Sequence, residues 1–256
     1  MLIDTHAHLQ MDDYNNDRDA VIVRAAEAGV KYIINASFDL PSSRQAVKLA
    51  EEHENLYAAV GVHPHDAKLL DDKTLDALRD LAGHPKVVAI GETGLDYYRN
   101  LSPRSVQKSA FERQLRLAEK VDLPAIVHNR EAHGDALEIL RRHSGQVRGV
   151  MHCFSGDREF ADTCIQMGLY ISFAGPVTYS KSHRLREVVT YVQRDRFFVE
   201  TDCPYLAPQF RRGKRNEPSY VKAIARKIAE TRHTTFPEIA QITTANAKAL
   251  FGIADQ

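Results

Sequence analysis

Short apolar runs alternate with helix-like segments along the whole chain, and this alternation is the feature that most limits how it can fold. Strands separated by helices pair in parallel, and runs that are apolar on both faces are typical of a sheet covered by helices. The runs that read as strands are Leu2–Thr5, Tyr32–Ser37, Tyr57–Val62, Val87–Glu92, Pro124–His128, Gly149–Phe154, Leu169–Gly175 and Phe197–Asp202. Eight such units in 256 residues predict a (β/α)8 TIM barrel of the α/β class.

The segments between these strands have the periodicity of helices. Helices are expected over Asn16–Ala28, from Pro41 onward, and over Lys73–Ala82, Ser105–Val121, Ala132–Arg142, Arg158–Met167, His183–Val192 and Tyr220–Glu230, with an extra C-terminal helix over Pro237–Leu250. We therefore expect one single barrel domain over residues 1–256. An open doubly wound sheet is the main alternative, but its first strand is usually followed by a glycine-rich loop. Here the first strand leads into THAHLQ, which contains no glycine.

Composition narrows the class of protein further. Lys and Arg balance Asp and Glu at 34 each, which disfavours a basic protein that coats nucleic acid without specificity. No apolar stretch reaches the length of about 20 residues that spans a membrane, and the start resembles no secretion signal. The 3 cysteines lack a paired spacing, as expected for free thiols in a reducing compartment. We expect a cytoplasmic location, no membrane contact and no obligate protein partner.

Polar side chains gather where the predicted strands end, which is the functional face of such a barrel. The residues at these ends that carry metal-binding chemistry are His6, His8, Glu92, His128, His152 and Asp202. In a strand, residues i and i+2 project from the same face, so His6 and His8 can both point into the barrel mouth. The last strand of a closed barrel lies beside the first, which brings Asp202 to the two histidines.

Imidazole and carboxylate groups together predict a divalent metal site, and they suit Zn, Mn, Fe, Co or Ni. Burying so many unpaired polar groups for structure alone would cost several kcal/mol, roughly 2–7 for each group. Glu92 could bridge two ions because a carboxylate has two oxygens. Two ions about 3.5–4 Å apart would clamp the attacking and leaving oxygens of a hydrolysis. Asp202 could bind one ion and also take the proton from the attacking water.

Taken as a set, the motifs DTHAHL, GVHPHD, GETGLDYYRN, VHNREA, HCFSG, ETDCPYLAP and RGKRNEP resemble the TatD-related metal-dependent deoxyribonucleases of the amidohydrolase-type barrel superfamily. The resemblance runs from residue 3 to the final helix. It implies a hydrolase of DNA phosphodiesters acting from a 3′ end with two divalent ions, for which Zn, Mg and Mn are candidates. Carried over by motif, His6, His8, Glu92 and Asp202 would hold one ion, and Glu92, His128 and His152 the second. Glu92 and Asp202 would also be the catalytic residues.

Many other amidohydrolases bridge their metals with a carbamylated lysine from the fourth strand. The fourth strand here, VVAIGETGLD, contains no lysine and offers Glu92. This difference disfavours a dihydroorotase-like or hydantoinase-like enzyme.

Several further residues could contact a substrate phosphate or base. The predicted contacts are His63, His65, Arg130, Arg211, Arg212, Lys214 and Arg215, although Arg130 could instead pair with Glu200. Tyr97, Tyr98 and Arg99 could stack on a base or simply pack within their loop, and Asp96 is expected to be a loop or supporting residue rather than a metal ligand. The main prediction is a 3′–5′ exonuclease that prefers single-stranded DNA. The resemblance also implies, as an alternative, a D-aminoacyl-tRNA deacylase or another ester or phosphoester hydrolase with the same dinuclear site. The sequence also leaves open a metal-dependent binding module without activity.

Overall fold

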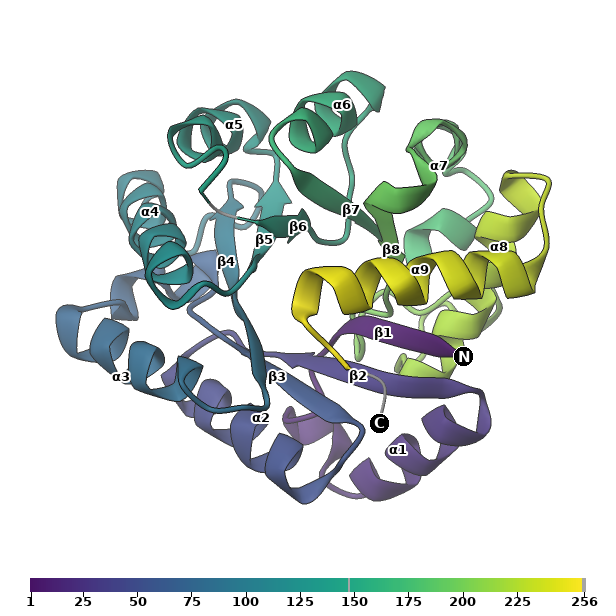
Figure 1. Ribbon diagram of the computed structural model, residues 1–256, viewed down its shortest axis with the longest axis horizontal. Coiled ribbons are helices and arrows are strands. Elements are labelled where there is room, and N and C mark those ends of the chain that lie inside the picture. The colour runs from purple at the N-terminus through teal and green to yellow at the C-terminus, as the bar shows by residue number, and fades with distance from the viewer. Residues whose placement is uncertain (147, 255–256) are drawn as a thin grey trace.

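The computed structural model describes residues 1–146 and 148–254. Parallel strands follow one another around a barrel in the order of the chain, with helices outside them (Figure 1). The strands are β1 (Leu2–Ala7), β2 (Val30–Ala36), β3 (Leu56–Val60), β4 (Val87–Asp96), β5 (Ala125–Arg130), β6 (Gly149–Met151), β7 (Leu169–Phe173) and β8 (Phe197–Val199). This arrangement of 8 strands confirms the predicted (β/α)8 fold class.

The helices fall where the sequence pattern predicts them, within a few residues. They are α1 (Arg18–Glu27), α2 (Leu40–Glu52), α3 (Asp72–Ala82), α4 (Arg104–Val121), α5 (His133–Arg142), α6 (Arg158–Gln166), α7 (His183–Tyr191), α8 (Val221–Thr231) and α9 (Phe236–Phe251). Several begin on a side-chain cap close behind a strand end. The Asp39 carboxylate accepts the Ser42 amide at the start of α2, and Asp157 accepts the Phe160 amide at the start of α6. Such caps satisfy amides that have no partner within the helix.

The barrel closes between β1 and the segment that follows β8. The Asp202 amide donates to the His6 carbonyl at 2.9 Å, and the His8 amide donates to the Cys203 carbonyl at 2.9 Å. Strand β8 itself ends at Val199, earlier than predicted, and Asp202 has a positive φ of 56° that interrupts the extended backbone. The chain nevertheless continues along β1, so the first and last strand ends are neighbours.

Strands β1, β4 and β5 continue past their predicted carboxyl ends, β5 as far as Arg130. β1 extends through His6 to Ala7, and β4 continues past Glu92 to Asp96. The extension of β4 pairs with β5, with Gly94 opposite His128 and Asp96 opposite Arg130. A side chain at Gly94 would place its Cβ only 2.0 Å from the His128 carbonyl oxygen, and this residue has a φ of +138°. Glycine is therefore required for β4 and β5 to lie this close at the barrel mouth.

Helix α9 covers the end of the barrel opposite the mouth (Figure 1). Its residues Leu250 and Phe251 are buried in a cluster with Ile3, Val88 and Phe198, which lie near the beginnings of their strands. Burial of large apolar side chains stabilises the fold by about 1.5–3 kcal/mol for each residue. The predicted C-terminal helix is therefore present and closes the barrel floor. In the described residues, we found no helix with the length and apolar character needed to cross a membrane.

Candidate metal centre

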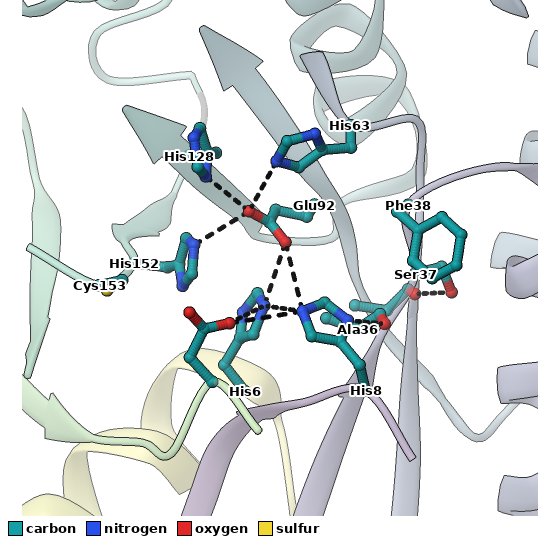
Figure 2. Close-up of polar contacts among 12 residues, drawn as sticks. His6, His8, Ala36, Ser37, Phe38, His63, Glu92, His128, His152 and Cys153 are labelled. Carbon is teal, nitrogen blue, oxygen red and sulfur yellow. Dashed lines mark hydrogen bonds and ion pairs between the residues drawn. The ribbon is translucent and has the colours of Figure 1, made fainter. Parts of the chain in front are cut away.

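Glu92 lies at the centre of a cluster of histidines at the carboxyl end of the barrel (Figure 2). Its two carboxylate oxygens face different groups of rings. Oε2 lies 3.2 Å from His6 Nε2 and 3.7 Å from His8 Nε2. Oε1 lies 2.8 Å from His128 Nδ1 and 3.0 Å from His152 Nε2. A single carboxylate thus joins side chains from β1, from β5 and from the loop after β6.

The histidines of β1 share one face of the strand, as their spacing predicts. The Nε2 atoms of His6 and His8 lie 3.2 Å apart. Asp202 approaches the same point from the segment after β8, with its Oδ1 3.8 Å from His6 Nε2 and 3.5 Å from His8 Nε2. The structure therefore brings together all six side chains predicted as metal ligands, although they span residues 6–202 of the chain.

His152 contacts both groups of predicted ligands, whereas the family motifs assign it only to the group of Glu92 and His128. Its ring stacks on His6 with centroids 3.9 Å apart, and it forms a cluster of candidate ligand atoms with His6 and Asp202. It also contacts Glu92 on the side of His128. His152 is thus positioned between the two groups, so the exact division of ligands between two ions stays a prediction.

The cluster is deeply buried, which makes its charges mutually dependent. Glu92 is 3 % exposed. Burial alone would raise the pKa of Glu92, but the imidazoles of His152, His63 and His6 hold it well below its usual range. Burial alone would lower the pKa of His152, but the carboxylates of Glu92 and Glu200 raise it well above its usual range. The site therefore stabilises positive charge among its carboxylates, whether protons or a metal ion carry that charge.

Three of the rings have a fixed acceptor on the nitrogen that points away from the centre. His8 Nδ1 lies 2.8 Å from the Ala36 carbonyl oxygen, and His152 Nδ1 lies 3.2 Å from Glu200 Oε1. His128 Nε2 lies 3.1 Å from Asp96 Oδ2. A carbonyl or carboxylate oxygen accepts a hydrogen bond from a ring N–H. The neutral ring therefore carries its proton on that nitrogen and presents its lone pair on the other one. This is the arrangement that orients metal-binding histidines.

These lone pairs face carboxylate oxygens, and this geometry shows whether a metal ion fits the site. With its proton on Nδ1, neutral His8 turns an acceptor toward Asp202 Oδ1 and Glu92 Oε2. Acceptors that face one another in a buried site repel unless a cation lies between them. Imidazole nitrogens and carboxylate oxygens are ligands for divalent transition ions. The residues present therefore fit a divalent metal centre.

His63 differs from the other rings although it is equally close. Its Nε2 lies 3.4 Å from Glu92 Oε1, so distance alone groups it with Glu92 and His128 as a candidate ligand. However, its Nδ1 accepts the backbone N–H of His65 at 3.1 Å. The proton of the neutral ring must then be on Nε2, facing the centre. Burial lowers the pKa of His63 to about 4, so the ring is neutral near pH 7. His63 thus presents a hydrogen-bond donor where the others present lone pairs.

Two carboxylates that were not predicted as metal ligands support the histidines of the centre. Asp96 is 1 % exposed and lies between two rings, with Oδ2 3.0 Å from His65 Nε2 and 3.1 Å from His128 Nε2. Glu200 Oε1 contacts His152 Nδ1 and accepts the Cys153 amide at 2.6 Å. Glu200 therefore does not pair with Arg130, the alternative left open by the sequence. Glu200 and Asp202 both directly follow β8, whose carboxyl end lies at the barrel mouth, and this position was the signal that both could reach the site.

The predicted substrate contacts occupy three kinds of environment. His65 is bound to Asp96, and the Arg130 guanidinium covers the ring of Tyr98. The basic side chains of the loop after β8 are exposed, and they are Arg211, Arg212, Lys214 and Arg215. Arg215 is already engaged, because both of its terminal nitrogens bond to Asp17, at 2.8 and 2.6 Å. Substrate contact by any of these residues stays a prediction.

The barrel and the buried histidine–carboxylate cluster define a metal-dependent hydrolase. A family model described as TatD related DNase matches residues 3–252, and the chain therefore belongs to this family. YabD of Bacillus subtilis (strain 168), described as an uncharacterized metal-dependent hydrolase, is 48% identical over 99% of this chain and 100% of its own. The 3′–5′ ssDNA/RNA exonuclease TatD of Citrobacter koseri is 39% identical over 99% of this chain and 100% of its own.

A solved structure agrees with this assignment. The TatD homologue YJJV from Escherichia coli K12 superimposes with a TM-score of 0.94 and 32% identity, covering 99% of this chain and 98% of that one. Together, the family and its relatives identify this protein as a metal-dependent hydrolase that acts on ester bonds.

Proposed function

We propose that this protein removes nucleotides from the 3′ end of single-stranded DNA by hydrolysing phosphodiester bonds. The observation that carries the proposal is Glu92, whose two oxygens face separate groups of histidines, as a bridging ligand between two divalent ions would. The name of the Citrobacter koseri relative supports a nucleic-acid substrate with this polarity. A mouth that leads to a buried site admits a single chain end more easily than a duplex.

In this proposal, His6, His8 and Asp202 would hold one ion, His128 and His152 would hold the other, and Glu92 would be a ligand of both. The ions would be Zn, Mg or Mn, and when bound they would supply an acidic water and neutralise charge on the phosphate. The remaining chemistry belongs to the chain itself. The Asp202 side chain is 13% exposed, so its carboxylate can reach a water molecule at the mouth. Asp202 is the general base that takes a proton from this water.

Two other groups act on the phosphate in this proposal. His63 Nε2–H faces the centre and donates to an oxygen of the phosphate, because its tautomer is fixed by the His65 amide. Arg130 and the basic loop after β8 contribute positive charge near the mouth. Charge of this kind positions a strand by its backbone without reading its sequence.

The test replaces Asp202 and compares substrates. Asp202→Asn should reduce cleavage of a 3′-labelled single-stranded oligonucleotide by about 100-fold or more, since it removes both the proton acceptor and a carboxylate ligand of one ion. Asp195→Asn is the matched control, because Asp195 is 70% exposed and lies away from the cluster. Circular dichroism should be unchanged in both variants, which would show that the fold is retained. Cleavage by Asp202→Asn at the wild-type rate would contradict the mechanism.

A substrate panel tests the specificity. Protein stripped of metal is reloaded separately with Zn, Mg or Mn and assayed on single-stranded DNA, on duplex DNA, on DNA with a blocked 3′ end, and on D-aminoacyl-tRNA. We expect cleavage of the free single strand and none of the blocked one. Activity on the aminoacyl ester alone would replace the proposal with a deacylase. Less than one tightly bound metal equivalent, with no activity on any substrate, would indicate a binding module.

A further inference from the structure

Exposed apolar side chains are concentrated on the face that carries the metal centre. Of the 9 large hydrophobic side chains that are exposed in the described part of the chain, 6 follow the carboxyl ends of β3, β4 and β8. These six are Leu69, Tyr98, Leu101, Tyr205, Leu206 and Phe210. Single exposed apolar residues are normal, but a concentration around one opening indicates a contact surface.

The two tyrosines that follow β4 have different environments. Tyr97 is half-buried, and its hydroxyl donates to Asp135 Oδ2. Tyr98 is 57% exposed, and the Arg130 guanidinium carbon lies 3.9 Å from its ring centroid. Arg130 therefore supports one side of the Tyr98 ring while much of the ring surface remains open to solvent. Tyr97 packs within the fold, so of this pair only Tyr98 is available to a ligand.

Tyr98 and Arg130 are held close to the metal centre by the pairing of β4 with β5. The Tyr97 amide donates to the Arg130 carbonyl at 2.9 Å, and Arg130 follows the ligand His128 by two residues. Their counterpart across the mouth is Tyr205, which is 52% exposed and has its ring centroid 6.3 Å from that of His8. Tyr205 thus lies beside His8, and Tyr98 follows by two residues Asp96, whose carboxylate contacts His128; Figure 2 shows both histidines.

We propose that Tyr98, supported by Arg130, is a stacking platform for a base close to the scissile phosphate. The inference rests on the proposed function and assigns it a specific recognition residue. We base the inference on the complementarity in charge and shape between this surface and a single nucleic-acid strand. The surface combines a flat open ring with a cation, and a single nucleic-acid strand presents flat bases on an anionic backbone. A duplex keeps its bases paired and stacked internally, so this platform favours unpaired nucleotides of any sequence.

The experiment separates base stacking from phosphate contact. KM and kcat are measured on a deoxyadenylate octamer and on an abasic octamer that keeps every phosphodiester. Tyr98→Leu should raise KM for the normal octamer about tenfold, a loss typical of one stacked base. It should leave kcat within about twofold and leave KM for the abasic octamer unchanged. Tyr98→Phe keeps the ring and should behave like the wild-type protein.

Tyr191→Leu is the matched control. Tyr191 is 39% exposed and has the Arg158 guanidinium carbon 3.4 Å from its ring centroid, but it lies at the end of α7 in the outer helix layer. This variant should leave KM for both octamers unchanged. The inference is overturned if Tyr98→Leu leaves KM for the normal octamer unchanged, or raises KM for both octamers equally.

A binding measurement tests base stacking on Tyr98 without requiring cleavage. If the wild-type protein cleaves neither octamer, the proposed nuclease activity is wrong. Fluorescence anisotropy with a labelled phosphorothioate octamer then decides whether Tyr98 binds bases. Binding about tenfold weaker in Tyr98→Leu than in Tyr191→Leu supports the platform, and equal binding rejects it.

Discussion

Asp96 fixes the orientation of His128. The Asp96 carboxylate lies 3.1 Å from His128 Nε2, while Nδ1 of the same ring lies 2.8 Å from Glu92 Oε1. One imidazole therefore connects a buried supporting carboxylate to the central one. Burial alone would raise the pKa of Asp96, but its hydrogen bonds with His128, Arg99 and His65 hold it below its usual range. Asp96 is consequently ionised and accepts a hydrogen bond from the Nε2–H of the His128 ring.

Asp96→Asn should weaken metal binding at the His128 side of the centre. The loss of the charged acceptor leaves the ring less basic and less firmly oriented, which typically costs about 10–100-fold in metal affinity. Calorimetric titration of metal into stripped protein measures the effect. Asp135→Asn is the control, because Asp135 bonds to Tyr97 and Lys108 and contacts no ring of the cluster. Equal affinities in Asp96→Asn and the wild-type protein would show that Asp96 has no such role.

His8→Ala should remove one bound metal and leave the other. His8 contacts the Oε2 side of Glu92 and Asp202, whereas His128 contacts the Oε1 side. Metal analysis after gel filtration should fall from about two equivalents to one, as expected when each ion has its own histidines. His84→Ala serves as the control, since His84 pairs with Glu51 on the surface. Loss of both ions in His8→Ala would mean that the two groups bind cooperatively as one site.

Glu217→Gln should destabilise the protein at neutral pH and have less effect in acid. Glu217 accepts three hydrogen bonds from Arg24, the shortest of them 2.7 Å, which tie the start of α8 to α1. Burial alone would raise the pKa of Glu217, but Arg24 and Ser219 lower it below its usual value. The carboxylate therefore contributes stability above its unfolded pKa, and this contribution is lost as pH falls through the folded pKa.

Because Arg24 is partly exposed, the expected loss is about 1 kcal/mol at pH 7. Urea unfolding at pH 7 and near pH 3.5 measures the change in free energy of unfolding. Glu230→Gln should have almost no effect, because the Glu230 side chain is 70% exposed and pairs with Lys227 within a single helix. If Glu217→Gln lowers the free energy of unfolding equally at both pH values, the loss is due to packing and not to the charge of Glu217.

Gly94→Ala should destabilise the barrel mouth. The new Cβ would lie 2.0 Å from the His128 carbonyl oxygen at a φ of +138°, so β4 or β5 must move. We expect a loss of about 2–4 kcal/mol in unfolding free energy, together with weaker metal binding at His128. Gly134→Ala is the control, because no heavy atom lies within 4 Å of its Cβ and helix α5 should tolerate it. Similar unfolding curves for the two variants would show that β4 has room to shift.

The parts of the site that follow from strand period and barrel closure were predictable from sequence. The i, i+2 spacing of His6 and His8 put both rings on one face, and closure of the barrel brought Asp202 beside them. The supporting carboxylates were harder to assign. Asp96 required knowing that its carboxylate lies between the rings of His65 and His128, and Glu200 required knowing which atom faces His152 Nδ1.

The state of His63 was beyond sequence reasoning for a similar reason. Whether its ring donates or accepts depends on a backbone amide two residues away in the same turn. Strand register and residue type do not determine this contact. The difference between Tyr97 and Tyr98 is likewise set by a partner on another element, since Asp135 belongs to α5.

Helix α9 closes the barrel floor, and the Met1 carbonyl accepts a hydrogen bond from Thr244 on this helix. Both ends of the described chain therefore lie on the side away from the metal centre (Figure 1). A fusion partner, an affinity tag or a surface linker attached at either end would leave from this side. The protein could thus be immobilised on a bead or sensor chip through either terminus with its reactive side turned to the solution.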